Sequence, residues 1–218
     1  MPNYKYVFFD VAGTLLHKPQ LFTRIDETLR CFGIAVDSVR LRERHKLLSE
    51  AIAFPPKTSS AFYNTFNAEL LYSLGIMPEE RLLTAIFEAC TYLPWERFAD
   101  ADALESVALP AGIISNWDAS LPKRLKTYFN MPFCKIVVSG VVGVSKPDRR
   151  IYEQALEGLP ANASEILYVG DSLKLDIQPA LQVGMTAVLL DRDDFYANYD
   201  GLKLRNLHEL PRLLAPAA

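Results

Sequence analysis

The hydrophobic pattern changes its period along the chain, and this change limits the folds that the sequence can adopt. From Pro94 onward, apolar runs of strand length alternate with segments whose apolar residues recur at helical spacing. The expected strands are residues 111–115, 135–138, 166–170 and 185–190, and the expected helices are residues 121–129, 149–156 and a segment that ends near Gly184. Strands that alternate with helices through short connections predict βαβ units and a mostly parallel sheet.

The first expected strand belongs to the same sheet as the later strands, and the helices that follow it interrupt this domain as an insertion. Residues 4–9 form a short apolar run that stops at Asp10, which predicts a buried strand followed by a tight turn. Between residues 19 and 92, apolar residues recur every three or four positions, which predicts four consecutive amphipathic helices. A single strand is not stable alone. We therefore expect an α/β fold with a Rossmann-like parallel sheet core, residues 1–16 and 96–218, and an inserted helical domain at 17–95.

Charge and composition exclude several classes of protein. The 218 residues include 23 basic and 26 acidic residues, which gives a formal net charge of −3, so the chain lacks the basic field that holds a nucleic acid backbone. No stretch approaches the roughly 20 apolar residues of a membrane span. Three widely spaced cysteines form neither a closed disulfide set nor a metal-binding pair. We expect a cytoplasmic protein that binds neither nucleic acid nor membrane, and a homodimer through the helical insertion remains open.

Polar residues end several of the expected strands and loops, where parallel α/β sheets bind ligands. They are Asp10 with Thr14, Ser115 with Asn116, Lys146 with Pro147, and Asp171 with Asp176. The three carboxylates would repel one another unless a hard cation lay among them, and oxygen ligands favour Mg²⁺. Lys146 lies two residues before Asp148, which we expect to be a helix N-cap. An ammonium group and a helix N-terminus can therefore both face an anion such as phosphate.

In order and spacing, these segments resemble the four motifs of the haloacid dehalogenase-like hydrolase superfamily, across nearly the whole chain. The segments are Asp10-Val11-Ala12-Gly13-Thr14, Ile113-Ile114-Ser115-Asn116, Ser145-Lys146-Pro147-Asp148, and Gly170-Asp171 with Asp176. The resemblance implies that Asp10 is a nucleophile that forms an aspartyl-phosphate intermediate. It also implies that Mg²⁺ is held by Asp10, Asp171 and the backbone carbonyl of Ala12, with support from Asp176.

The resemblance further implies roles for the remaining residues and for the helical insertion. Ser115 and Lys146 would act with Asp10 in catalysis, and the insertion would be a cap that closes over the site. Thr14, Ser115, Asn116 and Lys146 would bind the substrate, which we expect to be a small phosphate-bearing molecule whose identity the sequence does not indicate.

Position 12 is where the sequence departs from the family pattern. The commonest members carry an aspartate there, which protonates the leaving group and activates water, whereas Ala12 has no proton to give. Metal binding at this position uses the backbone carbonyl and so does not need the side chain. Loss of an acid/base group costs about 10² to 10⁴ in rate, so we expect weak activity on ordinary phosphate esters.

Three alternatives follow from this departure. The chain resembles a phosphonatase branch with alanine at this position and a cap lysine that forms a Schiff base; Lys46 and Lys57 are candidates, although a solvated lysine is the simpler interpretation of each. In the second, another residue or the substrate itself supplies the proton; His17 is the candidate residue, against the simpler interpretation of an exposed hinge histidine. A catalytically inactive Mg²⁺- and phosphate-binding protein is the third. Haloacid dehalogenation is disfavoured, because that branch works without metal and lacks the Gly170-Asp171 pair.

Overall fold

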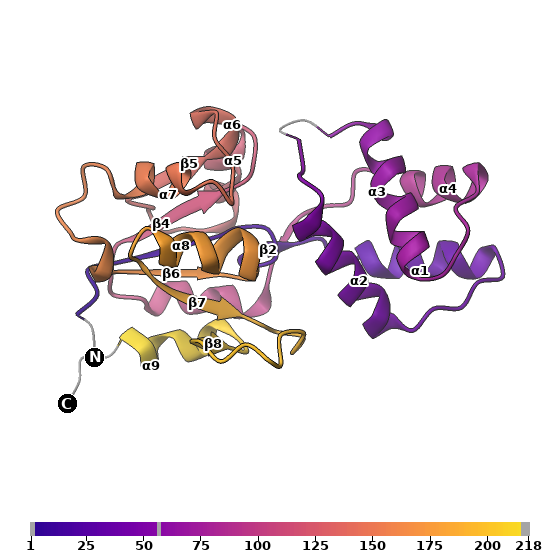
Figure 1. Ribbon diagram of the computed structural model, residues 1–218. Coiled ribbons are helices and arrows are strands. Elements are labelled where there is room, and N and C mark those ends of the chain that lie inside the picture. Colours follow the sequence, from indigo (N-terminus) through magenta and orange to yellow (C-terminus); the bar gives the residue numbers. More distant parts are fainter. Residues whose placement is uncertain (1–2, 56–57, 215–218) are drawn as a thin grey trace. The chain divides into compact units, whose positions relative to one another are not determined.

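The computed structural model describes residues 3–55 and 58–214, and its main feature is a six-stranded sheet (Figure 1). The strands lie in the order β5-β4-β1-β6-β7-β8, and every neighbouring pair is parallel. Their bounds are β1 Tyr6–Phe9, β4 Ala111–Ser115, β5 Lys135–Val138, β6 Ile166–Gly170, β7 Thr186–Leu190 and β8 Lys203–Leu204. Because β1 pairs with both β4 and β6, the first strand joins the C-terminal strands as the sequence predicts.

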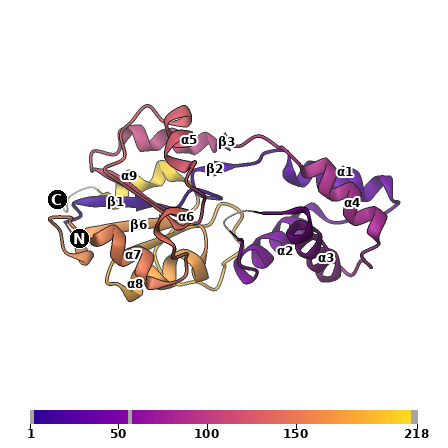
Figure 2. The same cartoon turned by 90° about the horizontal axis from the view of Figure 1, so that it is seen from above.

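Helices cover both sides of this sheet. They are α5 Leu121–Tyr128, α6 Ser139–Val142, α7 Arg149–Leu156, α8 Gln178–Gln182 and α9 Leu210–Leu214, with 3-10 turns η1 Ala99–Ser106, η2 Ala163–Glu165 and η4 Leu207–Glu209 and a π-helical turn η3 Leu173–Ile177. Figure 2 shows α7 and α8 on one side of the sheet and α5 and α9 on the other. Phe8, Tyr152 and Tyr168 belong to the buried core between the sheet and α7 and α8, which fixes the strands that carry the polar residues.

The chain divides into two compact units. The sheet unit consists of the chain up to His17 and from Arg97 onward, and the second unit is Lys18–Glu96. The second unit contains the four helices that the sequence predicts, namely α1 Leu21–Cys31, α2 Ser38–Ala51, α3 Ser60–Ser73 and α4 Glu80–Cys90. Leu29, Leu70 and Ile86 lie in its own buried core, so the helices bury apolar surface against one another.

The predicted elements shift by one or two residues at their ends, and several short elements were not predicted. The helix expected at 121–129 ends at Tyr128, and the strand expected at 185–190 begins at Thr186. Three strands were not predicted: β8, and the paired β2 Leu16–His17 and β3 Glu96–Arg97. Each has two residues, which is too short to produce a recognisable hydrophobic period. Within the described ranges, no helix is both long enough and apolar enough to cross a bilayer.

Candidate active site

The carboxyl ends of three adjacent strands bring together side chains that are far apart in sequence. Asp10 follows β1 directly, Ser115 is the last residue of β4, and Asp171 follows β6. The parallel register aligns these ends, because Phe9 pairs with Ile113 on one side and Val169 on the other. The sheet therefore places the predicted strand-end residues at one edge, as expected for an α/β ligand site.

Three carboxylates form a tight cluster at this edge. Asp10, Asp171 and Asp176 each offer an oxygen, and these oxygens lie within 4.8 Å of one another. Asp10 and Asp176 are buried and Asp171 is half-buried. Like charges at this separation are unfavourable without a counter-charge, and an all-oxygen donor set suits a hard divalent cation such as Mg²⁺. The cluster therefore fits the magnesium that the sequence implies.

Lys146 supplies one counter-charge inside the cluster. Its Nζ lies 2.5 Å from Oδ1 of Asp10 and 2.7 Å from Oδ1 of Asp176, and its side chain is 3% exposed. Burial alone would lower the pKa of Lys146, but attraction to the two carboxylates raises it above its ordinary value. Burial raises the pKa of Asp10 to about 7, against the lowering effect of Lys146. Lys146 therefore supplies a cation beside a carboxyl whose ionised form is disfavoured by burial.

Asn116, which directly follows β4, fixes the backbone of Lys146. Its side-chain amide accepts from the Lys146 backbone amide at 2.8 Å and donates to the Lys146 carbonyl at 3.0 Å. Ser115 Oγ lies 3.5 Å from Asp10 Oδ1, and Thr14 Oγ1 lies 3.5 Å from Asp171 Oδ1. The substrate role assigned to Asn116 stays a prediction, and the structure adds a positioning role that the sequence did not indicate.

Tyr168 is a site residue that the sequence analysis missed. It lies within β6, and its hydroxyl donates to Asp176 Oδ1 at 2.8 Å and is 3.5 Å from Lys146 Nζ. Burial, reinforced by the negative charge of Asp176, raises the pKa of Tyr168 well above its ordinary value, so the hydroxyl stays a donor. No sequence signal distinguishes it, because a tyrosine in an apolar strand has the pattern of a core residue.

Two glycines allow the carboxylates to approach the backbone. A Cβ on Gly13, whose φ is +89°, would lie 2.2 Å from Oδ2 of Asp171, and a Cβ on Gly170 would lie 2.4 Å from Cγ of Asp176. Both distances are far below van der Waals contact, so neither position can hold a side chain without moving a carboxylate. The family motifs of the sequence include both glycines, and the structure gives this physical reason for them.

Gly170→Ala is expected to lower the free energy of unfolding by about 1–3 kcal/mol, because the added methyl overpacks a buried site. Urea denaturation of the metal-free protein measures this change. Gly201→Ala is the matched control, since a Cβ there meets the outer end of the Tyr199 side chain, which can move. An equal loss in both variants would contradict the steric explanation.

The structure describes position 12 and two of the three residues considered in connection with its missing acid/base group. Ala12 itself is exposed. His17 is half-buried and its ring stacks on Phe98 with centroids 4.0 Å apart, so it is not exposed as expected, although it lies at the boundary between the two units. Lys46 is 20% exposed and lies 3.4 Å from Glu50, so the expectation of a solvated lysine is also wrong. Lys57 lies outside the described residues.

His45 and Asp148 have the structural roles that their positions suggest. His45 packs between the rings of Phe22 and Phe66, at centroid distances of 5.2 and 5.1 Å, and burial lowers its pKa to about 4. Asp148 caps α7, since its side chain accepts from the amide of Arg150 at 2.9 Å. Neither residue is needed to explain the carboxylate cluster.

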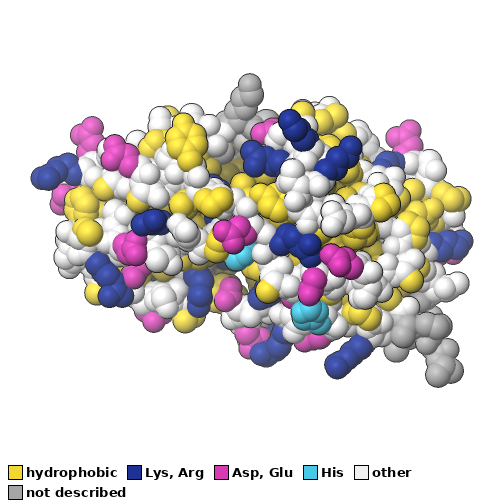
Figure 3. All heavy atoms as spheres, turned by 180° about the vertical axis from the view of Figure 1, so that it is seen from behind, with side chains coloured by type: hydrophobic (Ala, Val, Ile, Leu, Met, Phe, Trp, Pro, Cys, Tyr) yellow, Lys and Arg dark blue, Asp and Glu magenta, His cyan; other side chains and the backbone are white. Residues whose placement is uncertain are grey.

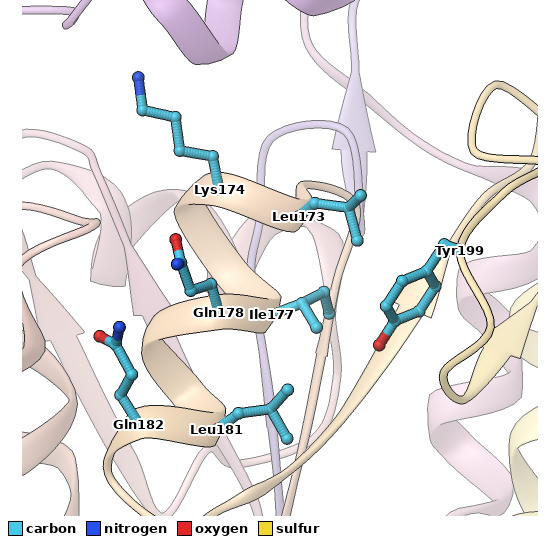
Figure 4. Close-up of a pocket in the computed structure, with 7 residues that line it drawn as sticks. All are labelled: Leu173, Lys174, Ile177, Gln178, Leu181, Gln182 and Tyr199. Atoms are coloured by element: carbon cyan, nitrogen blue, oxygen red, sulfur yellow. The ribbon is translucent and has the colours of Figure 1, made fainter.

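Among the residues that the structure describes, no other group of three or more carboxylate, histidine or cysteine side chains is placed to hold a metal ion. On the face in Figure 3, basic and acidic side chains are interspersed. Figure 4 shows a groove beside η3 and α8 in which three aliphatic side chains face Tyr199. It is lined by Leu173, Lys174, Ile177, Gln178, Leu181, Gln182 and Tyr199. None of the clustered carboxylates lines this groove, so we place the active site at the strand ends instead.

Comparisons with known proteins agree with this geometry. The sequence is 26% identical to a glyceraldehyde 3-phosphate phosphatase of Methanothermobacter thermautotrophicus, with 93% of this chain and 92% of that protein aligned. It is 31% identical to the pyrimidine 5′-nucleotidase YjjG of Escherichia coli, with 62% of each aligned. Some other curated relatives align over about half of their length or less, for example 53% or 42%.

A solved structure and a family match complete the comparison. The HAD-hydrolase YfnB from Bacillus subtilis, bound to magnesium, has the same fold with a TM-score of 0.67 and 22% sequence identity, over 97% of this chain and 99% of that chain. Residues 4–184 match the haloacid dehalogenase-like hydrolase family. This match spans most of the chain and includes every clustered carboxylate, so the chain belongs to the haloacid dehalogenase-like hydrolases.

Proposed function

We propose that the protein is a Mg²⁺-dependent phosphohydrolase that acts on a small phosphate monoester through an aspartyl-phosphate on Asp10. The observation that carries this proposal is the ammonium group of Lys146 bridging Asp10 and Asp176 inside a cluster of three carboxylates. A cation beside a nucleophilic carboxylate can receive the phosphoryl oxygens of a substrate. The relatives named as phosphatase and nucleotidase support a small phosphate-bearing substrate.

The residues have complementary roles in the proposed reaction. A carboxylate oxygen of Asp10 attacks phosphorus, and the bond from phosphorus to the leaving oxygen breaks. Lys146 and the hydroxyl of Ser115 donate to the phosphoryl oxygens, and Asn116 and Tyr168 keep Lys146 and Asp176 in place. Water then hydrolyses the acyl phosphate, which releases phosphate and restores Asp10.

The carboxylate cluster would hold the metal in this reaction. Asp10, Asp171 and the carbonyl of Ala12 are the proposed ligands, with Asp176 as support. When bound, Mg²⁺ neutralises charge and acts as a Lewis acid toward the phosphoryl group. Three carboxylates, one lysine and one divalent cation sum to zero charge, which favours the arrival of an anionic substrate.

The alanine at position 12 leads us to expect a low rate of turnover. The leaving oxygen has no proton donor at position 12, so departure must rely on solvent or on the substrate's own acidity. We therefore expect slow turnover that favours acidic leaving groups, such as a phenol. The alanine at position 12 also favours a second candidate function. This is a protein that binds Mg²⁺ and phosphate but catalyses no reaction.

The phosphonatase alternative is less well supported by the residues that the structure describes. A Schiff-base lysine must be neutral to attack an aldehyde. Lys46 lies 3.4 Å from Glu50, and a nearby carboxylate favours the protonated form. Its partner therefore opposes the reactivity that a phosphonatase needs.

The test is an activity panel with and without Mg²⁺, using an aryl phosphate, phosphonoacetaldehyde with borohydride, and a 2-haloacid. Asp10→Asn provides the background. We expect slow, Mg²⁺-dependent hydrolysis of the aryl phosphate only, with no borohydride-trapped adduct on Lys46 or Lys57. If the wild type shows none of these activities while phosphate still raises its Tm, the protein is the Mg²⁺- and phosphate-binding protein instead. A trapped adduct would establish the phosphonatase.

A further inference from the structure

Arg192 makes contacts that neither the proposed reaction nor the family motifs explain. It lies two residues after β7, and its side chain is 19% exposed. Its guanidinium donates to the backbone carbonyls of Gly13 and Thr14, both at 2.9 Å. It also forms a two-pronged pair with Asp100, at 3.0 and 2.8 Å. One side chain therefore holds the loop that follows Asp10.

This loop forms one side of the carboxylate cluster. Gly13 lies against the Asp171 carboxylate, and the Thr14 hydroxyl is 3.5 Å from it. The amide of Gly13 donates to the Leu16 carbonyl at 2.9 Å, and because the peptide is planar this bond also orients the Ala12 carbonyl. The next two carbonyls are the ones that Arg192 binds. The Ala12 carbonyl, which is the proposed metal ligand, is thus oriented by the hydrogen bond between Gly13 and Leu16. Arg192 holds the two carbonyls that follow it.

Arg192 is itself held on two sides. Asp100 also accepts from the Leu207 backbone amide at 2.9 Å, and hydrogen bonds from Arg192 and this amide lower its pKa although burial alone would raise it. The guanidinium carbon lies 3.8 Å from the Phe98 ring centroid, and the His17 ring stacks on Phe98 at 4.0 Å. Two groups this close to one centroid must occupy opposite faces of the ring.

We propose that Arg192 is a positioning residue that holds the loop 12–14 in the geometry needed for metal binding at the carboxylate cluster. This inference rests on the proposed function, because it assigns the metal to that cluster. Arg192 touches no reacting atom; it acts through the carbonyls of Gly13 and Thr14. Lysine cannot replace it, since a single ammonium cannot span two carbonyls and both oxygens of Asp100.

The experiment compares wild type, Arg192→Lys and Asp100→Asn with a destabilising control, Leu210→Ala, whose fully buried side chain lies in α9. Hydrogen exchange of the metal-free proteins monitors the amides of Gly13, Leu15 and Leu16, which are bonded within this loop. Calorimetric titration with MgCl₂ measures the Kd. We expect Arg192→Lys to speed exchange at these amides and to weaken Mg²⁺ binding by about tenfold to a hundredfold, the range for residues that orient metal ligands. Asp100→Asn should act in the same direction with a smaller effect.

Leu210→Ala should change neither quantity at this loop beyond its global loss of stability. Exchange rates or a Mg²⁺ Kd in Arg192→Lys that match those of Leu210→Ala would overturn the proposal, as would a wild type that binds no Mg²⁺. Absence of Mg²⁺-dependent hydrolysis in a wild type that binds Mg²⁺ would overturn only the proposed function, because both measurements are made without turnover.

Discussion

Ala12→Asp is expected to raise the kcat of Mg²⁺-dependent aryl phosphate hydrolysis at least about tenfold, because it restores an acid/base group that contributes about 10² to 10⁴ elsewhere. Ala12 is exposed, so the larger side chain can be accommodated. The gain should be greater for an alkyl phosphate than for an aryl phosphate, since a poorer leaving group depends more on protonation. Steady-state kinetics with both esters measures the two gains.

Ala12→Asn is the matched control for this prediction. Asparagine has nearly the same size and polarity as aspartate but cannot transfer a proton, so it should leave kcat close to the wild-type value. A gain that depends on proton transfer should also give the Ala12→Asp enzyme a decline in rate at high pH, where the general acid is ionised. Equal gains in the two variants, or no gain with the alkyl ester, would remove the acid/base explanation of Ala12.

The residues that the sequence predicts at the site share a recognisable position in the chain. Asp10, Ser115 and Asp171 each end an apolar segment of strand length, and parallel strands bring such ends to one edge. Hydrophobic period and strand ends are local features of sequence, so five of the six strands of the sheet, the four helices of the second unit and the carboxylate cluster could all be predicted. The clustering of Asp176 with the other two carboxylates followed from the same motifs.

The residues that sequence reasoning missed act through long-range contacts. Tyr168 has the pattern of a core tyrosine, and only the fold places its hydroxyl on Asp176. Arg192 is one arginine in a polar loop, and its bonds join it to residues nearly the whole chain away. The substrate role predicted for Asn116 stays a prediction, and only the fold shows that its amide also binds the Lys146 backbone. Such roles depend on backbone carbonyls and on side-chain direction, which leave no periodic signal in a single sequence.

Lys146→Met is expected to lower the free energy of unfolding of the metal-free protein by about 3–5 kcal/mol, because it leaves buried carboxylates without their partner. Lys146 contacts both Asp10 and Asp176 in a buried site, and methionine keeps most of its volume. Urea denaturation measures the loss. Lys5→Met is the matched control, since its ion pair with Glu165 is exposed at the surface and should contribute no more than about 1 kcal/mol.

The pH dependence of this loss identifies its cause. In the wild type, Lys146 opposes the rise that burial imposes on the pKa of Asp10, so its removal should raise that pKa above about 7. A carboxyl whose folded pKa exceeds the unfolded value of about 3.9 destabilises the fold as pH rises through that interval. The deficit of Lys146→Met should therefore be smaller at pH 5 than at pH 8, and adding Asp10→Asn should recover part of it at pH 8. A deficit that is independent of pH and unaffected by Asp10→Asn would show that Lys146 contributes by packing, which would also weaken its assignment as the cation of the active site.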